Sequence, residues 1–295
     1  MDVALVSVVI PAYNAAATLP AALESLVAQT FADWEAWVVD DGSTDATAQV
    51  AKAFSDSRVL FLRQANAGPS AARNRGLAAA RGEWVAFLDA DDTFEPDKLT
   101  RQLAAAAIHP EAVAITCDWH RPGVAVAPAP AELPWRRWRE ADLWSLNRFQ
   151  TSTVLARRQV LTRLGGFDPS VDGAEDWELW IRLAGQGPVV HLLWPLVAYA
   201  DSPGGVSKDL ERVYRCGEVM LRRHLANLPP PRRAELLAWH HLRFAVAFRL
   251  AGDPRYRRCL RPLRSPAAWP GALRAFFFRL VPFLWGRVRR RLSAG

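Results

Sequence analysis

Three carboxylates lie within four positions of the segment FLDADD, residues 87–92, directly after an apolar run. Asp89, Asp91 and Asp92 repel one another at neutral pH, and no basic residue is adjacent to them in the sequence. Three interpretations are open: a helix N-terminus near Pro96, a solvated surface, or a site for Mg²⁺ or Mn²⁺ against a diphosphate. Carboxylate oxygens are the hard ligands that these two ions prefer, so a metal site is a candidate.

A second acidic pair, Glu175 and Asp176, occurs in the segment GAEDWELW, residues 173–180. Acidic side chains stabilise the first turn of a helix, and this is one interpretation of the pair. A hydroxyl group is a poor nucleophile near neutral pH, so a carboxylate placed beside it can accept its proton as it attacks. The pair is therefore also a candidate general base.

The elements that must position these carboxylates alternate along the chain. Short apolar or β-branched segments that predict buried strands lie at residues 7–10, 37–39, 59–62 and 84–88. Helical segments between them predict an α/β fold with a mostly parallel sheet and helices on both faces. Ligands bind beyond the carboxyl ends of the strands in such sheets, which places Asp40 and Asp89 on one rim.

The composition suits a folded protein in a reducing compartment. Of the 295 residues, 51% are hydrophobic, enough for a full core. The three cysteines are far apart, which disfavours a disulfide framework or a zinc site. The N-terminus lacks the positive charge of a secretory signal, and no segment has about 18 consecutive apolar residues. We therefore expect a cytoplasmic protein.

Positive charge is concentrated near the C-terminus. Residues 208–295 hold 20 of the 37 Lys and Arg residues but only 5 of the 30 Asp and Glu residues. Residues 275–291 combine aromatic side chains with an arginine cluster, which is typical of an element bound to an anionic membrane surface. A helical subdomain with solvated arginines, packed on the rest of the protein, is the alternative. Nucleic acid is not expected as a partner, because no groove-reading or base-stacking motif accompanies the charge.

Five motifs occur in a fixed order along the chain. They are SVVIPAYN (7–14), VVDDGSTDAT (38–47), NAGPSAARNRG (66–76), FLDADD (87–92) and GGFDPSVDGAEDWELWIRLA (165–184). Together they resemble the inverting family 2 glycosyltransferases of the glycosyltransferase-A fold, over about residues 5–207. The resemblance implies a Rossmann-like sheet for nucleotide-diphospho-sugars, in a catalytic domain spanning 1–207. Its donor half would be about 1–118 and its acceptor half about 119–207, with a basic helical region at 208–295.

The resemblance also implies roles for individual residues. Those expected at the nucleotide-sugar donor are Pro11, Tyr13, Asn14, Asp40, Asp41, Arg73, Asn74 and Asp89. Asp91 would be the direct ligand of Mn²⁺ or Mg²⁺, with Asp89 near the ribose or the metal; the role of Asp92 is the least defined. Asp176 would be the general base, and Glu175 would orient the acceptor or cap the helix.

Several residues near the expected acceptor pocket allow two interpretations. Thr151, Ser152 and Trp177 are candidates to border it, although β-propensity and local hydroxyl hydrogen bonds explain Thr151 and Ser152 equally well. Trp119 and His120 would either stack on a sugar ring or pack partly buried in the fold.

The sequence departs from the family pattern in one loop. Many relatives have Tyr-Arg-x-His-x-x-Ser-x-Ser where this chain has YADSPGGVS, so Ala200 and Ser202 replace the Arg and the His. Asp201 or Lys208 would have to compensate. A catalytically degenerate protein that holds a nucleotide sugar is therefore the alternative function. A nucleotidyltransferase is disfavoured because residues 11–20 contain neither Gly nor Lys, and a dehydrogenase because GxGxxG is absent.

The function expected from these features is metal-dependent transfer of a sugar with inversion. The donor would be a nucleotide-diphosphate sugar, preferably a UDP-sugar, and the acceptor a hydroxyl of a glycan or lipid-linked molecule. Such a protein would serve cell-surface polysaccharide or glycolipid synthesis, in the cytoplasm or peripherally at the inner face of the membrane.

Overall fold

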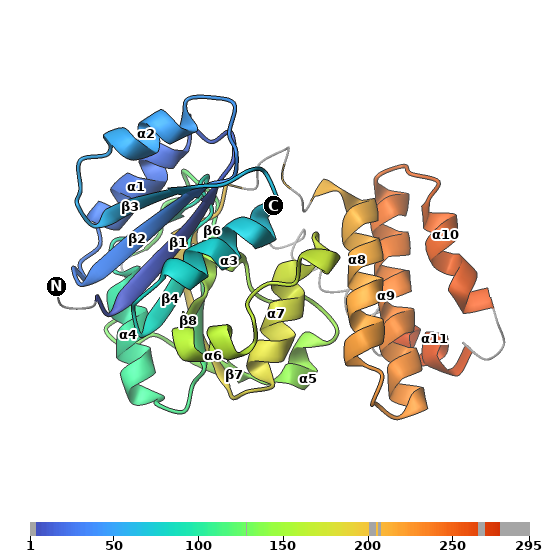
Figure 1. The fold of residues 1–295 in the computed structure, drawn as a ribbon. Coiled ribbons are helices and arrows are strands. Elements are labelled where there is room, and N and C mark those ends of the chain that lie inside the picture. Colours follow the sequence, from blue (N-terminus) through green and yellow to red (C-terminus); the bar gives the residue numbers. More distant parts are fainter. Residues whose placement is uncertain (1–3, 128, 201–204, 206–207, 265–268, 278–295) are drawn as a thin grey trace. The chain divides into compact units, whose positions relative to one another are not determined.

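The chain divides into two compact units, residues 1–203 and 204–295. The computed structural model describes residues 4–127, 129–200, 205, 208–264 and 269–277 (Figure 1). Residues 201–204 and 206–207 of the Ala200–Ser207 loop, and most of the arginine-rich tail, lie outside these ranges. None of the helices within the described ranges combines the length and apolar character needed to cross a bilayer.

The first unit is built on a sheet in which four strands are parallel, in the order β3-β2-β1-β4. These are β1 (Val6–Ala12), β2 (Trp34–Asp40), β3 (Val59–Arg63) and β4 (Trp84–Phe87). Ala12 pairs with Asp40 and Asp40 with Arg63, so the carboxyl ends of β1, β2 and β3 meet at one edge. The predicted segments are the observed strands, and the predicted α/β fold class is confirmed.

Beyond β4 the sheet becomes mixed. It continues β4-β8-β6-β9-β5, with β7 also paired to β9. The strands are β5 (Thr93–Phe94), β6 (Ala114–His120), β7 (Trp135–Trp138), β8 (Leu155–Arg157) and β9 (Val189–Ala198). β8 is antiparallel to both β4 and β6, and β9 is parallel to β6. The strands β4, β6 and β9 therefore point the same way and end at one edge.

Helices cover both faces of the sheet (Figure 1). Apolar residues of α1 (Leu19–Val27), α2 (Thr47–Ala53) and α4 (Lys98–Ile108) pack with one set of alternate strand residues in the main core. On the other face, α3 (Pro69–Ala79) lies directly on β1 and β2. A Cβ atom at Gly76 of α3 would lie 2.4 Å from Val9, so only glycine permits this close approach.

The remaining elements of the first unit are short, apart from α7. They are α5 (Glu140–Leu143), the 3₁₀ turn Thr151–Thr153, α6 (Arg158–Arg163), the 3₁₀ turn Pro169–Val171 and α7 (Glu175–Ala184). The rings of Phe87, Phe167 and Trp180 pack together, with centroids 5.1 to 6.1 Å apart. This cluster fixes the start of α7 against the end of β4.

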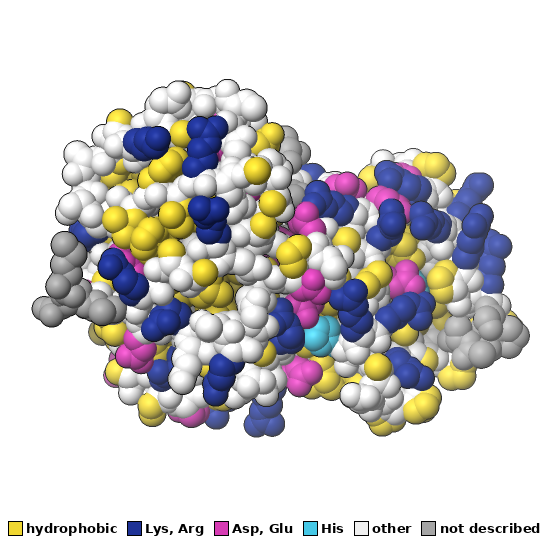
Figure 2. Space-filling view, in the orientation of Figure 1, with side chains coloured by type: hydrophobic (Ala, Val, Ile, Leu, Met, Phe, Trp, Pro, Cys, Tyr) yellow, Lys and Arg dark blue, Asp and Glu magenta, His cyan; other side chains and the backbone are white. Residues whose placement is uncertain are grey.

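The described part of the second unit is helical. It comprises α8 (Leu210–His224), α9 (Pro230–Leu250), α10 (Tyr256–Leu260), a 3₁₀ turn (Arg261–Arg264) and α11 (Trp269–Ala275). Its core contains Tyr214, Phe244, Phe248 and Cys259. Lys and Arg side chains are dense over α8, α9 and α10 in Figure 2.

Candidate active site

The first predicted site residue, Asp40, ends β2 at the carboxyl edge of the sheet and is fully buried. Its Oδ1 accepts a hydrogen bond from the Ser43 backbone N at 3.0 Å. Its Oδ2 lies 3.2 Å from Arg63 Nε but accepts no hydrogen bond from the described residues. A buried carboxylate oxygen without a donor is costly, so this atom is suited to receive one from a ligand.

The loop after β1 is tied to the loop after β2. The Asn14 side chain oxygen accepts from Thr44 N at 2.9 Å, and the Asn14 backbone N donates to Ser43 Oγ at 2.9 Å. Asn14 has a positive φ of 49°, a conformation that asparagine tolerates better than most residues. Tyr13 beside it is 52% exposed. The structure thus gives Asn14 a loop-fixing role and leaves the Tyr13 ring accessible near Pro11.

Asp41 organises the start of α3. Its Oδ1 accepts from Gln64 Nε2 at 2.7 Å and Ala67 N at 3.0 Å, and its Oδ2 accepts from Gly68 N at 2.8 Å. These bonds hold the segment before Pro69 at the same edge of the sheet. Asp41 therefore positions the helix that carries Arg73.

The aspartates of FLDADD follow β4 and differ in their surroundings. The Asp89 side chain is 26% exposed, whereas Asp92 is buried. Asp92 accepts from Ser152 Oγ at 2.5 Å through Oδ2 and from Ala200 N at 2.8 Å through Oδ1. Ser152 Oγ also accepts from Asp89 N at 3.0 Å. Asp92 thus fastens the end of β9 to the end of β4.

Burial raises the pKa of Asp92 to about 7, and the charges of Asp89 and then Asp91 add to this effect. The part of this shift that comes from the neighbouring carboxylates reflects surplus negative charge at the end of β4. A divalent cation would relieve that surplus.

Arg73 joins the two acidic motifs. Its Nη2 donates to Asp89 Oδ1 at 2.8 Å, and its Nη1 donates to Glu175 Oε1 at 3.1 Å. The guanidinium also lies over the Phe167 ring, 5.3 Å from its centroid. Repulsion between the clustered carboxylates is therefore partly offset by a cation that is remote in sequence. Arg73 is buried, and the nearby carboxylates strongly favour its charged form by raising its pKa.

Asp176 lies next to this bridge at the start of α7. Its Oδ2 accepts from Asn147 Nδ2 at 2.7 Å, and its Oδ1 accepts from Trp177 N at 2.6 Å. Burial raises the pKa of Asp176 to about 7, and the charge of Glu175 raises it further. A proton acceptor with a pKa near the operating pH is the most effective kind of general base.

Asn147 is a site neighbour that the sequence analysis did not find. It lies 29 residues before Asp176 in an irregular segment, and no local spacing connects the two. Asn74, expected at the nucleoside, instead binds the backbone of Phe167 through both ends of its amide, at 2.8 Å each. Its amide is therefore engaged in holding the turn before α7.

The three residues expected near the acceptor are buried. Thr151 and Ser152 lie in the 3₁₀ turn Thr151–Thr153. The Ser152 hydroxyl hydrogen-bonds both Asp89 N and Asp92 Oδ2. The Trp177 indole donates to the Leu143 carbonyl at 2.7 Å and is 3% exposed.

The donor set at the end of β4 fits a divalent metal ion. Asp89 and Asp91 supply hard carboxylate oxygens, and their charges add to the burial that raises the pKa of Asp92. Within the described residues, no three His, Cys, Asp or Glu side chains are grouped as a complete metal site. Mg²⁺ is often held by one or two carboxylates together with substrate phosphates and water, and these aspartates match that pattern.

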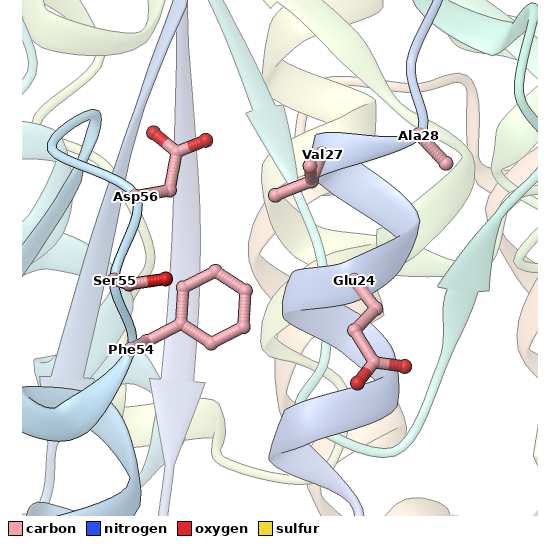
Figure 3. Close-up of a pocket in the computed structure, with 6 residues that line it drawn as sticks. All are labelled: Glu24, Val27, Ala28, Phe54, Ser55 and Asp56. Atoms are coloured by element: carbon pink, nitrogen blue, oxygen red, sulfur yellow. The ribbon is translucent and has the colours of Figure 1, made fainter.

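A separate hollow of about 410 Å³ lies at the opposite edge of the sheet (Figure 3). Glu24, Val27 and Ala28 at the end of α1 face Phe54, Ser55 and Asp56 after α2. None of the predicted site residues lines it. The Asp56 carboxylate is also already engaged by Arg58 at 2.7 Å.

Comparison with known families and proteins agrees with this geometry. The family model "Glycosyl transferase family 2" matches residues 7–162. A PGL/p-HBAD biosynthesis glycosyltransferase of Mycobacterium bovis is 30% identical over 216 residues, covering 71% of this chain and 82% of that protein. UDP-Glc:alpha-D-GlcNAc-diphosphoundecaprenol beta-1,3-glucosyltransferase WfgD of Escherichia coli is 44% identical over 105 residues, 35% of this chain and 42% of that protein.

The fold is shared with solved structures. The mannosyltransferase PcManGT from Pyrobaculum calidifontis, solved with GDP-Man and Mn²⁺, superposes with a TM-score of 0.61 at 21% identity. The superposition covers 95% of this chain and 89% of that one. The match covers only part of other curated relatives: it spans 29%, 14% and 27% of the length of three of them.

Proposed function

The chain belongs to glycosyltransferase family 2, and we propose that it transfers a sugar from a nucleotide-diphosphate donor to a hydroxyl acceptor. The observation that carries the proposal is the Arg73 bridge between Asp89 and Glu175. It unites a candidate metal motif and a candidate base motif, whose residues are far apart in the sequence, at one edge of the sheet. A protein that only bound nucleotide would not need the second motif.

A UDP-sugar is the proposed donor. The nucleotide base would lie near Tyr13 and donate its imide N–H to Asp40, whose buried Oδ2 accepts no hydrogen bond from the described residues. One relative is named for UDP-Glc and for a diphosphoundecaprenol-linked acceptor, which supports a UDP-sugar and a lipid-linked or glycan acceptor. Cell-surface polysaccharide or glycolipid synthesis is the setting that fits these substrates.

Asp91 and Asp89 would hold Mn²⁺ or Mg²⁺. The solved neighbour with GDP-Man and Mn²⁺ supports this choice of ion. When bound, the ion would stabilise the negative charge that develops on the diphosphate leaving group. The hydrogen bond from Arg73 Nη2 orients the Asp89 carboxylate for this purpose.

Asp176 would act on the acceptor. Its carboxylate takes the hydroxyl proton while the oxygen attacks the anomeric carbon and the bond to the diphosphate breaks. Asn147 and Trp177 N hold the carboxylate in one orientation, so the proton is accepted at a fixed place. A single displacement of this kind inverts the anomeric configuration.

Two substitutions separate binding from chemistry. We expect Asp91→Ala to abolish Mn²⁺-dependent UDP binding in calorimetry. Asp176→Asn should bind UDP normally and lower turnover of a UDP-sugar by about 10²- to 10⁴-fold. Glu24→Gln, in the hollow at the opposite edge, is the control and should behave as wild type.

Turnover is followed as UDP release from a panel of UDP-sugars with Mn²⁺. Wild-type protein that binds UDP-sugar but never releases UDP would establish the alternative, a degenerate nucleotide-sugar-binding protein. Normal turnover by Asp176→Asn would remove this residue as the base.

We further propose that the second unit meets an anionic membrane surface from the cytoplasmic side. Trp269, Leu273, Phe276 and Phe277 are 44 to 61% exposed, and Arg261 and Arg264 are exposed in the preceding turn. Exposed aromatic residues beside arginines favour the headgroup region of anionic bilayers. Co-sedimentation with phosphatidylglycerol vesicles should weaken in Trp269→Ser/Leu273→Ser and persist in the control Ile108→Ser.

A further inference from the structure

A pair of aromatic side chains, exposed Trp119 and half-buried Tyr199, lies at the same edge of the sheet as the aspartate cluster. Trp119 near the end of β6 is 40% exposed, and its ring centroid is 5.2 Å from that of Tyr199, which follows β9. The two strands are also linked here, because Tyr199 N donates to the His120 carbonyl at 2.8 Å. The pair is therefore held by backbone structure on adjacent strands.

The pair is close to the candidate metal motif along the chain and in space. Thr93, which follows Asp92, pairs with Ala198, which precedes Tyr199. In addition, Ala200 N donates to Asp92 Oδ1 at 2.8 Å. Tyr199 therefore lies between Ala198, which pairs with Thr93, and Ala200, which hydrogen-bonds Asp92. The Trp119 ring packs against the Tyr199 ring.

Other tryptophans of the first unit show that Trp119 is not part of the core. Trp34, Trp84, Trp177 and Trp180 are all less than 5% exposed. Trp119 instead leaves much of its ring accessible, with polar residues on either side along β6. Asp118 Oδ1 accepts a hydrogen bond from His191 Nε2 at 3.0 Å, and Glu95 Oε1 accepts one from His120 Nε2 at 2.9 Å.

We propose that Trp119 and Tyr199 form a platform on which a pyranose ring stacks during the reaction. The face of an aromatic ring is negative, whereas the C–H groups on one face of a sugar ring are weakly positive. The flanking polar groups would receive the hydroxyls at the ring's edge. This inference rests on the proposed function and adds a sugar subsite beside the diphosphate.

The pyranose can come from the donor or from the acceptor, and the test distinguishes them. Trp119→Ala is compared with Trp135→Ala, a matched control that removes a 46% exposed tryptophan from β7, away from this edge. Calorimetry with UDP and with UDP-glucose in Mn²⁺ reports contacts to the donor sugar. Saturation-transfer NMR with glucose and N-acetylglucosamine oligosaccharides reports contacts to an acceptor sugar.

A donor platform predicts that Trp119→Ala weakens UDP-glucose binding roughly tenfold and leaves UDP binding unchanged. An acceptor platform predicts unchanged binding of both nucleotides and loss of the oligosaccharide NMR signal. Trp119→Phe should retain most of either effect, because it keeps an aromatic face. If Trp119→Ala matches Trp135→Ala in every assay, the platform is refuted. If wild type binds oligosaccharide but no UDP-sugar, the proposed donor chemistry fails while the platform stands.

Discussion

The two units both bury ionisable side chains, but they do so in different surroundings. In the first unit, Asp89, Asp92, Arg73 and Glu175 form a connected group at the carboxyl edge of a sheet. In the second unit, the buried polar groups lie inside a helical core. The His240 ring stacks on Tyr214 with centroids 5.3 Å apart, and Tyr214 Oη hydrogen-bonds His241 Nδ1 at 3.0 Å.

Shifted pKa values occur in both places, and burial is the largest cause in each. Burial lowers the pKa of His240 well below its usual range, and burial raises the pKa of Cys259 to about 11. Both groups are thereby kept neutral, as a helical core requires. In the first unit, like charges reinforce burial and raise the pKa of Asp92 and Asp176 to about 7. A shifted pKa therefore indicates a functional site only where several like charges lie close together at the carboxyl ends of the strands.

Removing the charge of Arg73 tests this contrast most strongly. Arg73→Gln leaves the buried Glu175 without its cation, and we expect a loss of about 3 kcal/mol in the free energy of unfolding. Arg73→Lys can contact one carboxylate but not both in the same way. Its free energy of unfolding should therefore lie between those of Arg73→Gln and the wild type. Urea denaturation measures the loss. Arg75→Gln, on the exposed side of the same helix, is the control.

The pH dependence of turnover tests whether the charged group of the first unit is catalytic. The folded pKa of Asp176 is raised to about 7, so the base is protonated and inactive below that pH. The logarithm of kcat should therefore rise with unit slope up to about pH 7, a tenfold change per pH unit, and then level off. A flat profile between pH 5 and 8 would contradict the assignment.

Stability should respond to Asp176 in the opposite direction. A carboxyl whose folded pKa exceeds its unfolded value destabilises the protein increasingly as the pH rises between the two values. Asp176→Asn should therefore raise the melting temperature at pH 8 more than at pH 5. Differential scanning calorimetry at both values measures the difference.

The second unit should tolerate loss of its buried histidine. In His240→Phe an aromatic ring is retained against Tyr214 and Phe244, and the hydrogen bond to the Tyr214 carbonyl is lost. We expect destabilisation of about 1 kcal/mol by urea denaturation and no change in UDP binding. A loss as large as that of Arg73→Gln would remove the distinction between the two units.

The sequence predicts the parallel part of the sheet well, because β1, β2 and β4 are almost wholly buried and therefore continuously apolar. It does not predict β7, whose residues Trp135–Trp138 are mainly exposed and carry no apolar alternation. The aspartates of the site are recognisable by their clustering. The Arg73–Glu175 contact spans 102 residues, so no local pattern in the sequence indicates it.

Substitution of Asn147 tests how a neighbouring amide shifts the pKa of Asp176, and its expected effect is the smallest. Its amide donates to Asp176 Oδ2 at 2.7 Å and stabilises the ionised form, so Asn147→Ala should raise the pKa of Asp176. Arg73 and Glu175, the other charged groups that face Asp176, are unchanged by this substitution. We expect the acid limb of the kcat profile to move up by about half a pH unit, equivalent to about 0.7 kcal/mol.

The control for this shift is Gln150→Ala, which truncates an amide in the same segment without touching Asp176, and its profile should match wild type. A residue that only supported the fold would lower kcat at every pH and leave the position of the limb unchanged. Asn147→Asp sharpens the result, because a second carboxylate beside the base must move the limb further up than alanine does. If alanine and aspartate lower kcat equally and neither moves the limb, Asn147 does not tune the base.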